Sequence, residues 1–129
     1  MLVPFNFAHD YPTQKPNHYL VCPKNFCKAT PDQISPILKL SSTQLKKKVA
    51  HIITNQPRTK LIEYNNKKHY YFYEQRSKVF KFPDYITVQI IPINENESSL
   101  AIYSQSKYGY YDFGINQKRI ENWLNQIQK

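Results

Sequence analysis

Residues 84–107 read DYITVQIIPINENESSLAIYSQSK, and this stretch decides the fold because it describes two strands joined by one turn. Isoleucine and valine occupy every second position from 86 to 90, with Thr87 and Gln89 between them. After the polar run NENES, Leu100 and Ile102 continue the same alternation. A period of two is typical of strands with one buried face, so the stretch predicts an antiparallel hairpin over a core.

Two segments show the helical period instead. SSTQLKKKVAHIITNQP, residues 41–57, can be capped by Ser42 or Thr43 and must end before Pro57. Residues 115–128 form the second segment. The apolar positions that face the core are Leu45, Val49, Ile52 and Ile53 in the first and Ile120, Trp123, Leu124 and Ile127 in the second. Both patterns predict amphipathic helices that pack on the sheet.

A second hairpin is predicted between the first helix and residue 84. TKLIEY and KHYYFYE flank Asn65-Asn66, and asparagine tolerates the left-handed backbone of a two-residue turn. In that register Glu63 lies opposite Lys68, and Leu61 lies opposite Tyr70. If the sheet face without helices were open, aromatic residues of the two hairpins would form a basic and aromatic surface with nearby lysines. Its candidate residues are Tyr71, Tyr73 and Tyr103.

These elements predict an α+β fold of one domain. With a short first strand at PILKL, residues 36–40, the order is β-α-β-β-β-β-α. The sheet then has four or five antiparallel strands, with two helices on one face. Residues 1–35 are rich in proline and predict an extended arm packed on the single domain at residues 36–129.

Composition limits the partners. The net charge is +9, which favours an anionic partner such as nucleic acid or another polyanion. Fifteen of the eighteen basic residues are lysines, whereas specific base and phosphate recognition favours arginine. Nucleic-acid binding should therefore be weak and independent of sequence. No apolar run approaches the roughly 20 residues of a membrane span, and the N-terminus as given does not read as a signal peptide.

The two cysteines, Cys22 and Cys27, are separated by four residues. They could form a local disulfide, remain free thiols, or join His9 and His18 in a metal site. The disulfide is favoured, and it would place the protein outside the reducing cytosol. The histidines lack metal-site spacing, and two glycines are too few for a phosphate-binding loop, so no metal or cofactor is expected.

The run SKYGYYDFGINQKR, residues 106–119, joins the last strand to the last helix. Gly109 and Gly114 permit positive φ, and Asp112 is placed to accept hydrogen bonds from N–H groups at the helix start. Arg119 could reach back to Asp112 or Asp84. The run is explained either as a structural junction or as a ligand site.

The same run, together with three earlier residues of the central hairpin region, carries a family resemblance. The matching positions are Phe82, Asp84, Ser104, Ser106, Gly109, Asp112, Gly114, Asn116 and Arg119. In this spacing the chain resembles the domain-of-unknown-function 1499 family over about residues 15–128, including the Pro16-Asn17 segment. The resemblance implies uncharacterised bacterial and plastid proteins, many with an N-terminal membrane or lipoprotein-type segment, and it brings no catalytic residues.

The sequence therefore predicts a non-catalytic domain of the bacterial cell envelope that binds a small ligand, a lipid or a protein partner. The alternatives are a nucleic-acid or polyanion binder and, after it, an unrecognised hydrolase. The candidate ligand-binding residues are Asp84, Ser104, Ser106, Tyr108, Gly109, Asp112, Asn116 and Arg119.

Overall fold

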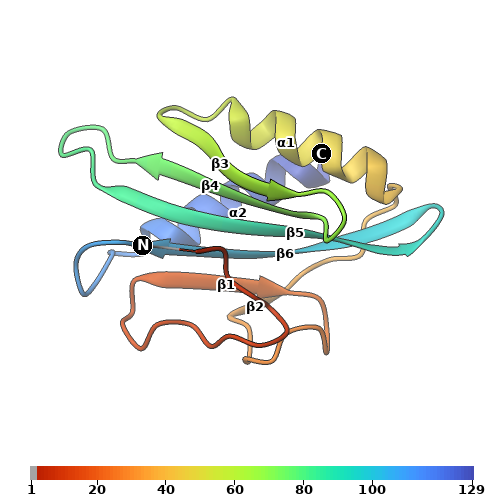
Figure 1. Ribbon diagram of the computed structural model, residues 1–129, viewed down its shortest axis with the longest axis horizontal. Coiled ribbons are helices and arrows are strands. Elements are labelled where there is room, and N and C mark those ends of the chain that lie inside the picture. Colours follow the sequence, from red (N-terminus) through yellow and green to blue (C-terminus); the bar gives the residue numbers. More distant parts are fainter. Residues whose placement is uncertain (1–2) are drawn as a thin grey trace.

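The computed structural model describes residues 3–129 and confirms the predicted α+β class (Figure 1). Its sheet has six strands in the spatial order β2-β1-β6-β5-β4-β3, and only the pair β1 and β2 is parallel. Along the chain the elements are β1 (His18–Cys22), β2 (Gln33–Ile34), α1 (Ser42–Thr54), β3 (Thr59–Asn65), β4 (Tyr70–Arg76), β5 (Pro83–Asn94), β6 (Glu97–Ser106) and α2 (Ile115–Gln128). The observed order is therefore β-β-α-β-β-β-β-α, with one strand more before α1 than the sequence predicted.

The main core lies between the sheet and the two helices. The alternating apolar residues of β5 and β6 face the helices as predicted, and all are buried. From α2, Trp123 and Leu124 enter this core, and Leu45 and Val49 enter it from α1. Burying one such large side chain stabilises the fold by about 1.5–3 kcal/mol, so the amphipathic faces hold the helices on the sheet.

Helix α1 starts one residue earlier than predicted. Its N-cap is Ser41, whose Oγ accepts a hydrogen bond from the Gln44 backbone N–H at 3.1 Å. The Gln44 side chain accepts one from the Ser41 N–H at 3.0 Å, which completes a capping box. This reciprocal pair explains why Ser41, rather than Ser42 or Thr43, caps the helix.

The start of the sheet differs from the prediction. The PILKL strand is absent apart from one bridge between Leu38 and Ser98, and the first strand is β1, inside the segment predicted as an arm. Strand β1 pairs with β6, and β2 then pairs with β1. The prolines at 16 and 23 lie on either side of β1, so they bound a strand rather than prevent one.

The second hairpin has a different register from the predicted one. Leu61 lies opposite Tyr73 and Glu63 opposite Phe72, with an irregularity between them at Ile62. Asn65 pairs with Tyr70, so the turn comprises residues 66–69 rather than two residues, and within it Asn65 Oδ1 accepts a hydrogen bond from the Lys68 N–H at 3.0 Å. The shift alters which strand residues face each other but leaves the element order unchanged.

The N-terminal segment covers part of the sheet face opposite the helices (Figure 1). Phe5 donates its backbone N–H to Thr87 Oγ1 at 2.9 Å, and its ring stacks on Tyr103 with centroids 4.1 Å apart. Phe7 is buried in the same small cluster. Thr87 and Tyr103, which point away from the helices as predicted, are therefore also buried.

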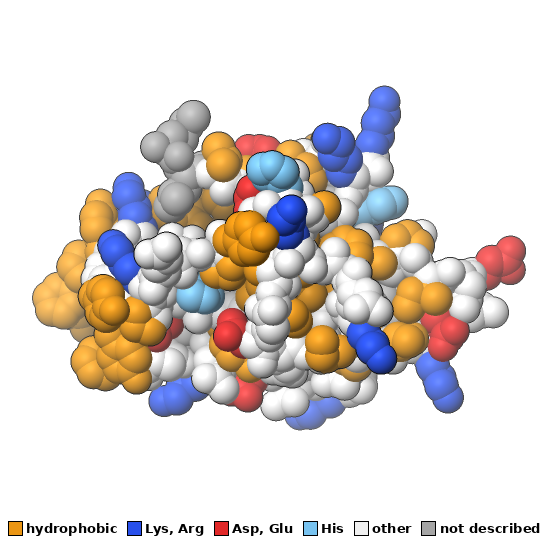
Figure 2. All heavy atoms as spheres, turned by 90° about the horizontal axis from the view of Figure 1, so that it is seen from below, with side chains coloured by type: hydrophobic (Ala, Val, Ile, Leu, Met, Phe, Trp, Pro, Cys, Tyr) orange, Lys and Arg blue, Asp and Glu red, His pale blue; other side chains and the backbone are white. Residues whose placement is uncertain are grey.

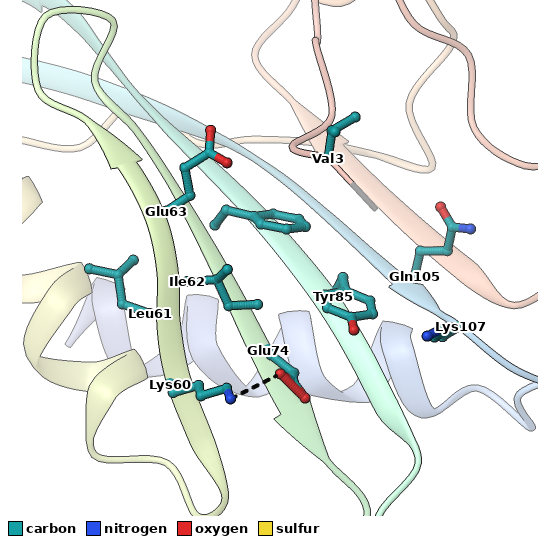
Figure 3. A pocket seen from close by; sticks show the side chains of 10 residues that line it. Val3, Lys60, Leu61, Ile62, Glu63, Glu74, Tyr85, Gln105 and Lys107 are labelled. Carbon is teal, nitrogen blue, oxygen red and sulfur yellow. Dashed lines mark ion pairs between the residues drawn. The ribbon is translucent and has the colours of Figure 1, made fainter. Parts of the chain in front are cut away.

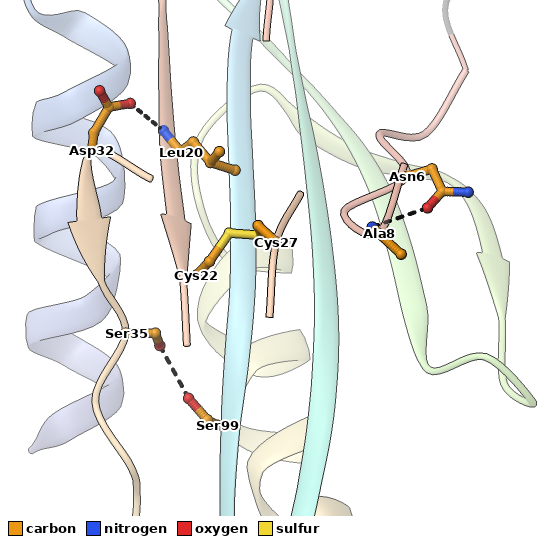
Figure 4. Close-up of a disulfide and its surroundings, with 8 residues drawn as sticks. All are labelled: Asn6, Ala8, Leu20, Cys22, Cys27, Asp32, Ser35 and Ser99. Atoms are coloured by element: carbon orange, nitrogen blue, oxygen red, sulfur yellow. Dashed lines mark hydrogen bonds between the residues drawn. A yellow bond between two sulfur atoms is a disulfide. The ribbon is translucent and has the colours of Figure 1, made fainter. Parts of the chain in front are cut away.

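A disulfide joins Cys22 at the end of β1 to Cys27, which confirms the favoured pairing (Figure 4). The enclosed residues form a turn in which Pro23 O accepts the Phe26 N–H at 3.1 Å. Nearby, Asp32 Oδ2 accepts the Leu20 N–H at 2.8 Å. These bonds attach the proline-rich segment to the edge of the sheet.

Candidate functional site

Asn116 is the centre of a buried polar network at one end of the sheet. It lies in the first turn of α2 and is fully buried. Its Nδ2 donates to Asn17 O at 3.0 Å, to Ser106 Oγ at 2.9 Å and to Asp112 Oδ2 at 2.7 Å. Its Oδ1 accepts from Ser104 Oγ at 2.6 Å. One side chain thus connects β6, the segment before β1 and the loop before α2.

Arg119 extends the network to β4 and β5. Its Nη2 pairs with Asp84 Oδ2 at 2.6 Å, and its Nε donates to Gln75 Oε1 at 2.6 Å. Its Nη1 donates to Asn116 Oδ1 at 2.7 Å and to Ser104 Oγ at 3.0 Å. Of the two carboxylates that the sequence left open for Arg119, the ion pair is with Asp84.

Asp112 fixes the β6–α2 loop, residues 107–114. Its Oδ1 accepts the Gly114 N–H at 2.9 Å, and its Oδ2 accepts the Asn116 N–H at 3.1 Å. The carboxylate therefore satisfies N–H groups at the helix start, as predicted for a structural junction. Gly109 and Gly114 have φ of +85° and +77°, a region that favours glycine. Asn17 Nδ2 also donates to Gly109 O at 2.8 Å, which holds the loop from the other side.

This polar network forms the floor of a cavity of about 690 Å³, here called the end cavity. Its sides are the β6–α2 loop and the β4–β5 loop, residues 77–82. Six of the eight candidate ligand-binding residues line it: Asp84, Ser106, Tyr108, Gly109, Asp112 and Arg119. Ser104 and Asn116 are fully buried beneath it and hold Arg119 in place.

Exposed aromatic rings form the walls of the end cavity. The ring of Phe82 lies 5.5 Å from that of Phe80 and 5.6 Å from that of Tyr108, so one aromatic row crosses both loops. Tyr111 and Phe113 make an edge-to-face pair at 4.9 Å. Phe80 and Phe113 are 73% and 77% exposed, far more than aromatic rings that serve a core.

Several residues of the end cavity were missed from the sequence. Phe80, Tyr111, Phe113 and the arginines at 58 and 76 line it without having been proposed. A usable signal was present, because both loops carry aromatic residues where connecting loops usually carry polar ones. Nothing in the sequence indicated that Arg58 lines the end cavity, because its place there follows from the register of β3 against β4.

The proposed aromatic surface of Tyr71, Tyr73 and Tyr103 does not exist. Tyr71 and Tyr73 face the helices in the main core, whereas Tyr103 lies under the N-terminal segment on the other face. Burial raises the pKa of both Tyr73 and Tyr103 to about 12. The surface required an open sheet face without helices, and these rings are instead part of the two buried clusters.

A second hollow lies on the sheet face opposite the helices (Figure 3). This groove of about 840 Å³ has apolar sides that include Leu61, Ile62 and Tyr85. Buried Glu74 lies there, with Lys60 Nζ at 3.6 Å and Arg76 Nε at 2.6 Å from its side-chain oxygens. The groove contains none of the candidate ligand-binding residues.

In residues 3–129, no three His, Cys, Asp or Glu side chains gather in a way that could hold a metal ion. Across the same range, no helix has both the length and the apolar character needed to cross a membrane.

The family model "Protein of unknown function (DUF1499)" matches residues 12–127, so the chain belongs to this family. No curated protein matches the sequence. Among solved structures, the chain is similar to an uncharacterized protein from Bacillus thuringiensis, with a TM-score of 0.55 and 14% identity. The alignment covers 73% of this chain and 93% of the other. At that identity the likeness supports the fold alone.

Proposed function

We propose that this DUF1499 domain is a non-catalytic binding domain of the cell envelope, and that its end cavity takes a small amphipathic anion. The observation that carries the proposal is an open cavity with exposed aromatic walls over a floor of mutually bonded polar groups. Its volume is within the range of pockets that bind small molecules.

The aromatic walls support an apolar or ringed part of the ligand. Phe82 lies between Phe80 and Tyr108, so a ringed group could pack against aromatic side chains already in place. The floor is rigid because Arg119 and Asn116 use their hydrogen-bonding groups on one another and on their neighbours. A site fixed in this way has little ordering cost when a ligand binds.

The charges around the end cavity support an anionic group. Both carboxylates at its floor are engaged, Asp84 by Arg119 and Asp112 by N–H groups of the helix start. Arg58 and Arg76 stand at its side, and both are exposed. Arg58 donates from Nε to the backbone O of Arg76 at 2.9 Å, and this bond holds the Arg58 side chain against the end of β4. The Arg76 guanidinium is already engaged by the Glu74 carboxylate and the Lys81 carbonyl. The Arg58 guanidinium is therefore the group beside the aromatic wall that suits a sulfonate, carboxylate or phosphate head.

The disulfide supports a location outside the reducing cytosol, because such bonds persist in oxidising compartments. This is the basis for assigning the domain to the cell envelope.

Anilinonaphthalene sulfonate tests the binding proposal, since it is an aromatic amphipathic anion whose fluorescence rises in apolar sites. We expect saturable binding that Phe82→Ala and Arg58→Ala each weaken by about tenfold. Tyr64→Ala is the matched control, because Tyr64 is equally exposed on β3 but does not line the end cavity. Nile red, which is neutral, should respond to Phe82→Ala but not to Arg58→Ala. Equal binding by all three variants, with circular dichroism showing them folded, contradicts the proposal.

The polyanion alternative is supported by the charge of +9 alone. A single-stranded oligonucleotide should bind weakly, and its affinity should fall with salt with a log-log slope of about 3 to 5. Tight binding that depends on base sequence at physiological salt would favour the alternative over the end cavity.

A further inference from the structure

One end of the molecule exposes an unusual amount of apolar surface. Figure 2 shows hydrophobic side chains gathered at its left-hand end, where Figure 1 places the β4–β5 and β6–α2 loops. This surface, here called the aromatic end, consists of Val79, Phe80, Phe82, Tyr108, Tyr110, Tyr111 and Phe113, and each side chain is more than half exposed. A large exposed apolar patch of this kind typically marks an interaction surface.

The two loops of the aromatic end are held by hydrogen bonds. In the β4–β5 loop, the Ser77 N–H donates to Phe82 O at 3.0 Å, and the Phe82 N–H donates back to Ser77 Oγ at 3.0 Å. Arg76 Nη1 donates to Lys81 O at 2.8 Å. The β6–α2 loop is also bonded to the first residue of β5, because the Lys107 N–H donates to Pro83 O at 3.2 Å, and the Phe82 and Tyr108 rings meet across the two loops. The exposed rings therefore project from a fixed base.

Lysines surround the apolar side chains. The two loops together contain Lys78, Lys81 and Lys107, all exposed, and a single acidic residue, Asp112. The Asp112 carboxylate accepts hydrogen bonds from the start of α2, so it faces the helix rather than a partner. Lys107 Nζ lies 5.3 Å from the centre of the Tyr108 ring, which places a positive charge beside the apolar surface.

We propose that the aromatic end docks on the surface of an anionic lipid bilayer. Tyrosine and phenylalanine side chains are suited to the boundary between headgroups and acyl chains, and lysines beside them attract anionic headgroups. The exposed charge around the rings has one sign, since the three lysines of the two loops are exposed and Asp112 is bonded to the helix start, and this fits a uniformly anionic surface. Five of the seven residues of the aromatic end also line the end cavity, but Val79 and Tyr110 do not, so these two positions can test docking separately from ligand binding.

Co-sedimentation with lipid vesicles tests this proposal. We expect the protein to bind vesicles of equal parts phosphatidylglycerol and phosphatidylcholine, to bind pure phosphatidylcholine much less, and to be released by salt. The double variant Val79→Ser/Tyr110→Ser should lose about tenfold in partitioning. Tyr64→Ser is its control, since Tyr64 is 58% and Tyr110 68% exposed.

A second pair of variants tests the charge. Lys78→Gln/Lys107→Gln should weaken binding by about fivefold for each lysine. Its control is Lys67→Gln/Lys68→Gln, in the β3–β4 turn at the opposite end of β4. All of these positions are exposed, so folding should be preserved.

Three results would overturn the docking proposal. The protein could ignore anionic vesicles at low salt, or the variants of the aromatic end could bind them as well as their controls do. Alternatively, Val79→Ser/Tyr110→Ser could abolish a self-association seen by sedimentation velocity while leaving vesicle binding intact, which would assign the surface to a second copy of the chain. Because this variant leaves the lining of the end cavity unchanged, retained binding of anilinonaphthalene sulfonate separates failure of docking from failure of the proposed function.

Discussion

Breaking the ion pair between Arg119 of α2 and Asp84 of β5 should strongly destabilise the fold. The side chains are 10% and 15% exposed, and the charged atoms lie 2.6 Å apart. Removing one partner of a buried pair typically costs about 3–5 kcal/mol, and the residual exposure places Arg119→Ala at about 3 kcal/mol. Asp84→Ala removes one of the four partners of Arg119, so about 2 kcal/mol is expected.

The two changes delete one shared interaction, so their effects should not add. We expect the double variant to lose about 1–2 kcal/mol less than the sum of the single losses. Urea unfolding with the disulfide intact measures this, and the fluorescence of Trp123 is a direct probe because it is the only tryptophan and is buried in α2. Full additivity, to within about 0.5 kcal/mol, would refute the reasoning.

Asp112 and Arg119 provide the comparison cycle. They do not bond to each other, but both bond to Asn116, so their coupling should be smaller than that of Asp84 and Arg119. Asp112→Ala alone should still lower stability by about 1–2 kcal/mol, because it exposes N–H groups at the helix start. A larger coupling for Asp112 and Arg119 would show that the network is organised differently.

Three further results are expected. Replacing Cys22 and Cys27 with serine should cost about 2 kcal/mol in urea unfolding, because the closed loop is short; an unchanged midpoint would contradict this. Burial holds the pKa of Tyr73 and Tyr103 at about 12, above the ordinary value of 10.0, so both phenols stay protonated in the folded state. Their contribution to the free energy of unfolding should therefore be fully present below pH 10.0 and be lost as the pH rises toward 12. Tyrosine absorbance should rise as the chain unfolds, and titration of all tyrosines without unfolding would exclude this. Gly114→Ala should lower the free energy of unfolding by about 1 kcal/mol because of the positive φ alone, since no atom lies within 4 Å of the added Cβ. A loss of stability several times larger in thermal unfolding would indicate a steric cause.

The helices and the central hairpin could be predicted because local pattern and final environment agree there. Val49 and Trp123 lie on apolar helical faces, and Ile86 and Ile102 follow the period of two, so each periodicity leads to the same core. The first strand could not be found in this way. Strand β1 is short and lies between prolines, and its place depends on pairing with β6, a contact of long sequence separation.

The candidate site was predicted in part. The spacing from Gly109 to Arg119 indicated a junction with a capping carboxylate, which is what Asp112 provides. The partner of Arg119 remained open because Asp84 and Asp112 are both in reach of a long side chain, and only the pairing of β5 with β6 decides between them. The aromatic surface was predicted wrongly because Tyr103 is covered by residues almost a hundred positions away, including Phe5.

The end cavity can be tested directly with the two glycines of the chain. Selective ¹⁵N-glycine labelling gives one amide signal for each, and both report on this region, since Gly109 lines the cavity and Gly114 lies between two of its lining residues, Phe113 and Ile115. If the end cavity is the binding site, titration with anilinonaphthalene sulfonate should shift the Gly109 signal saturably. The dissociation constant obtained from this shift should equal the one measured by fluorescence. Two signals that stay unchanged while the fluorescence saturates would contradict the account and place binding elsewhere, such as the groove on the sheet face.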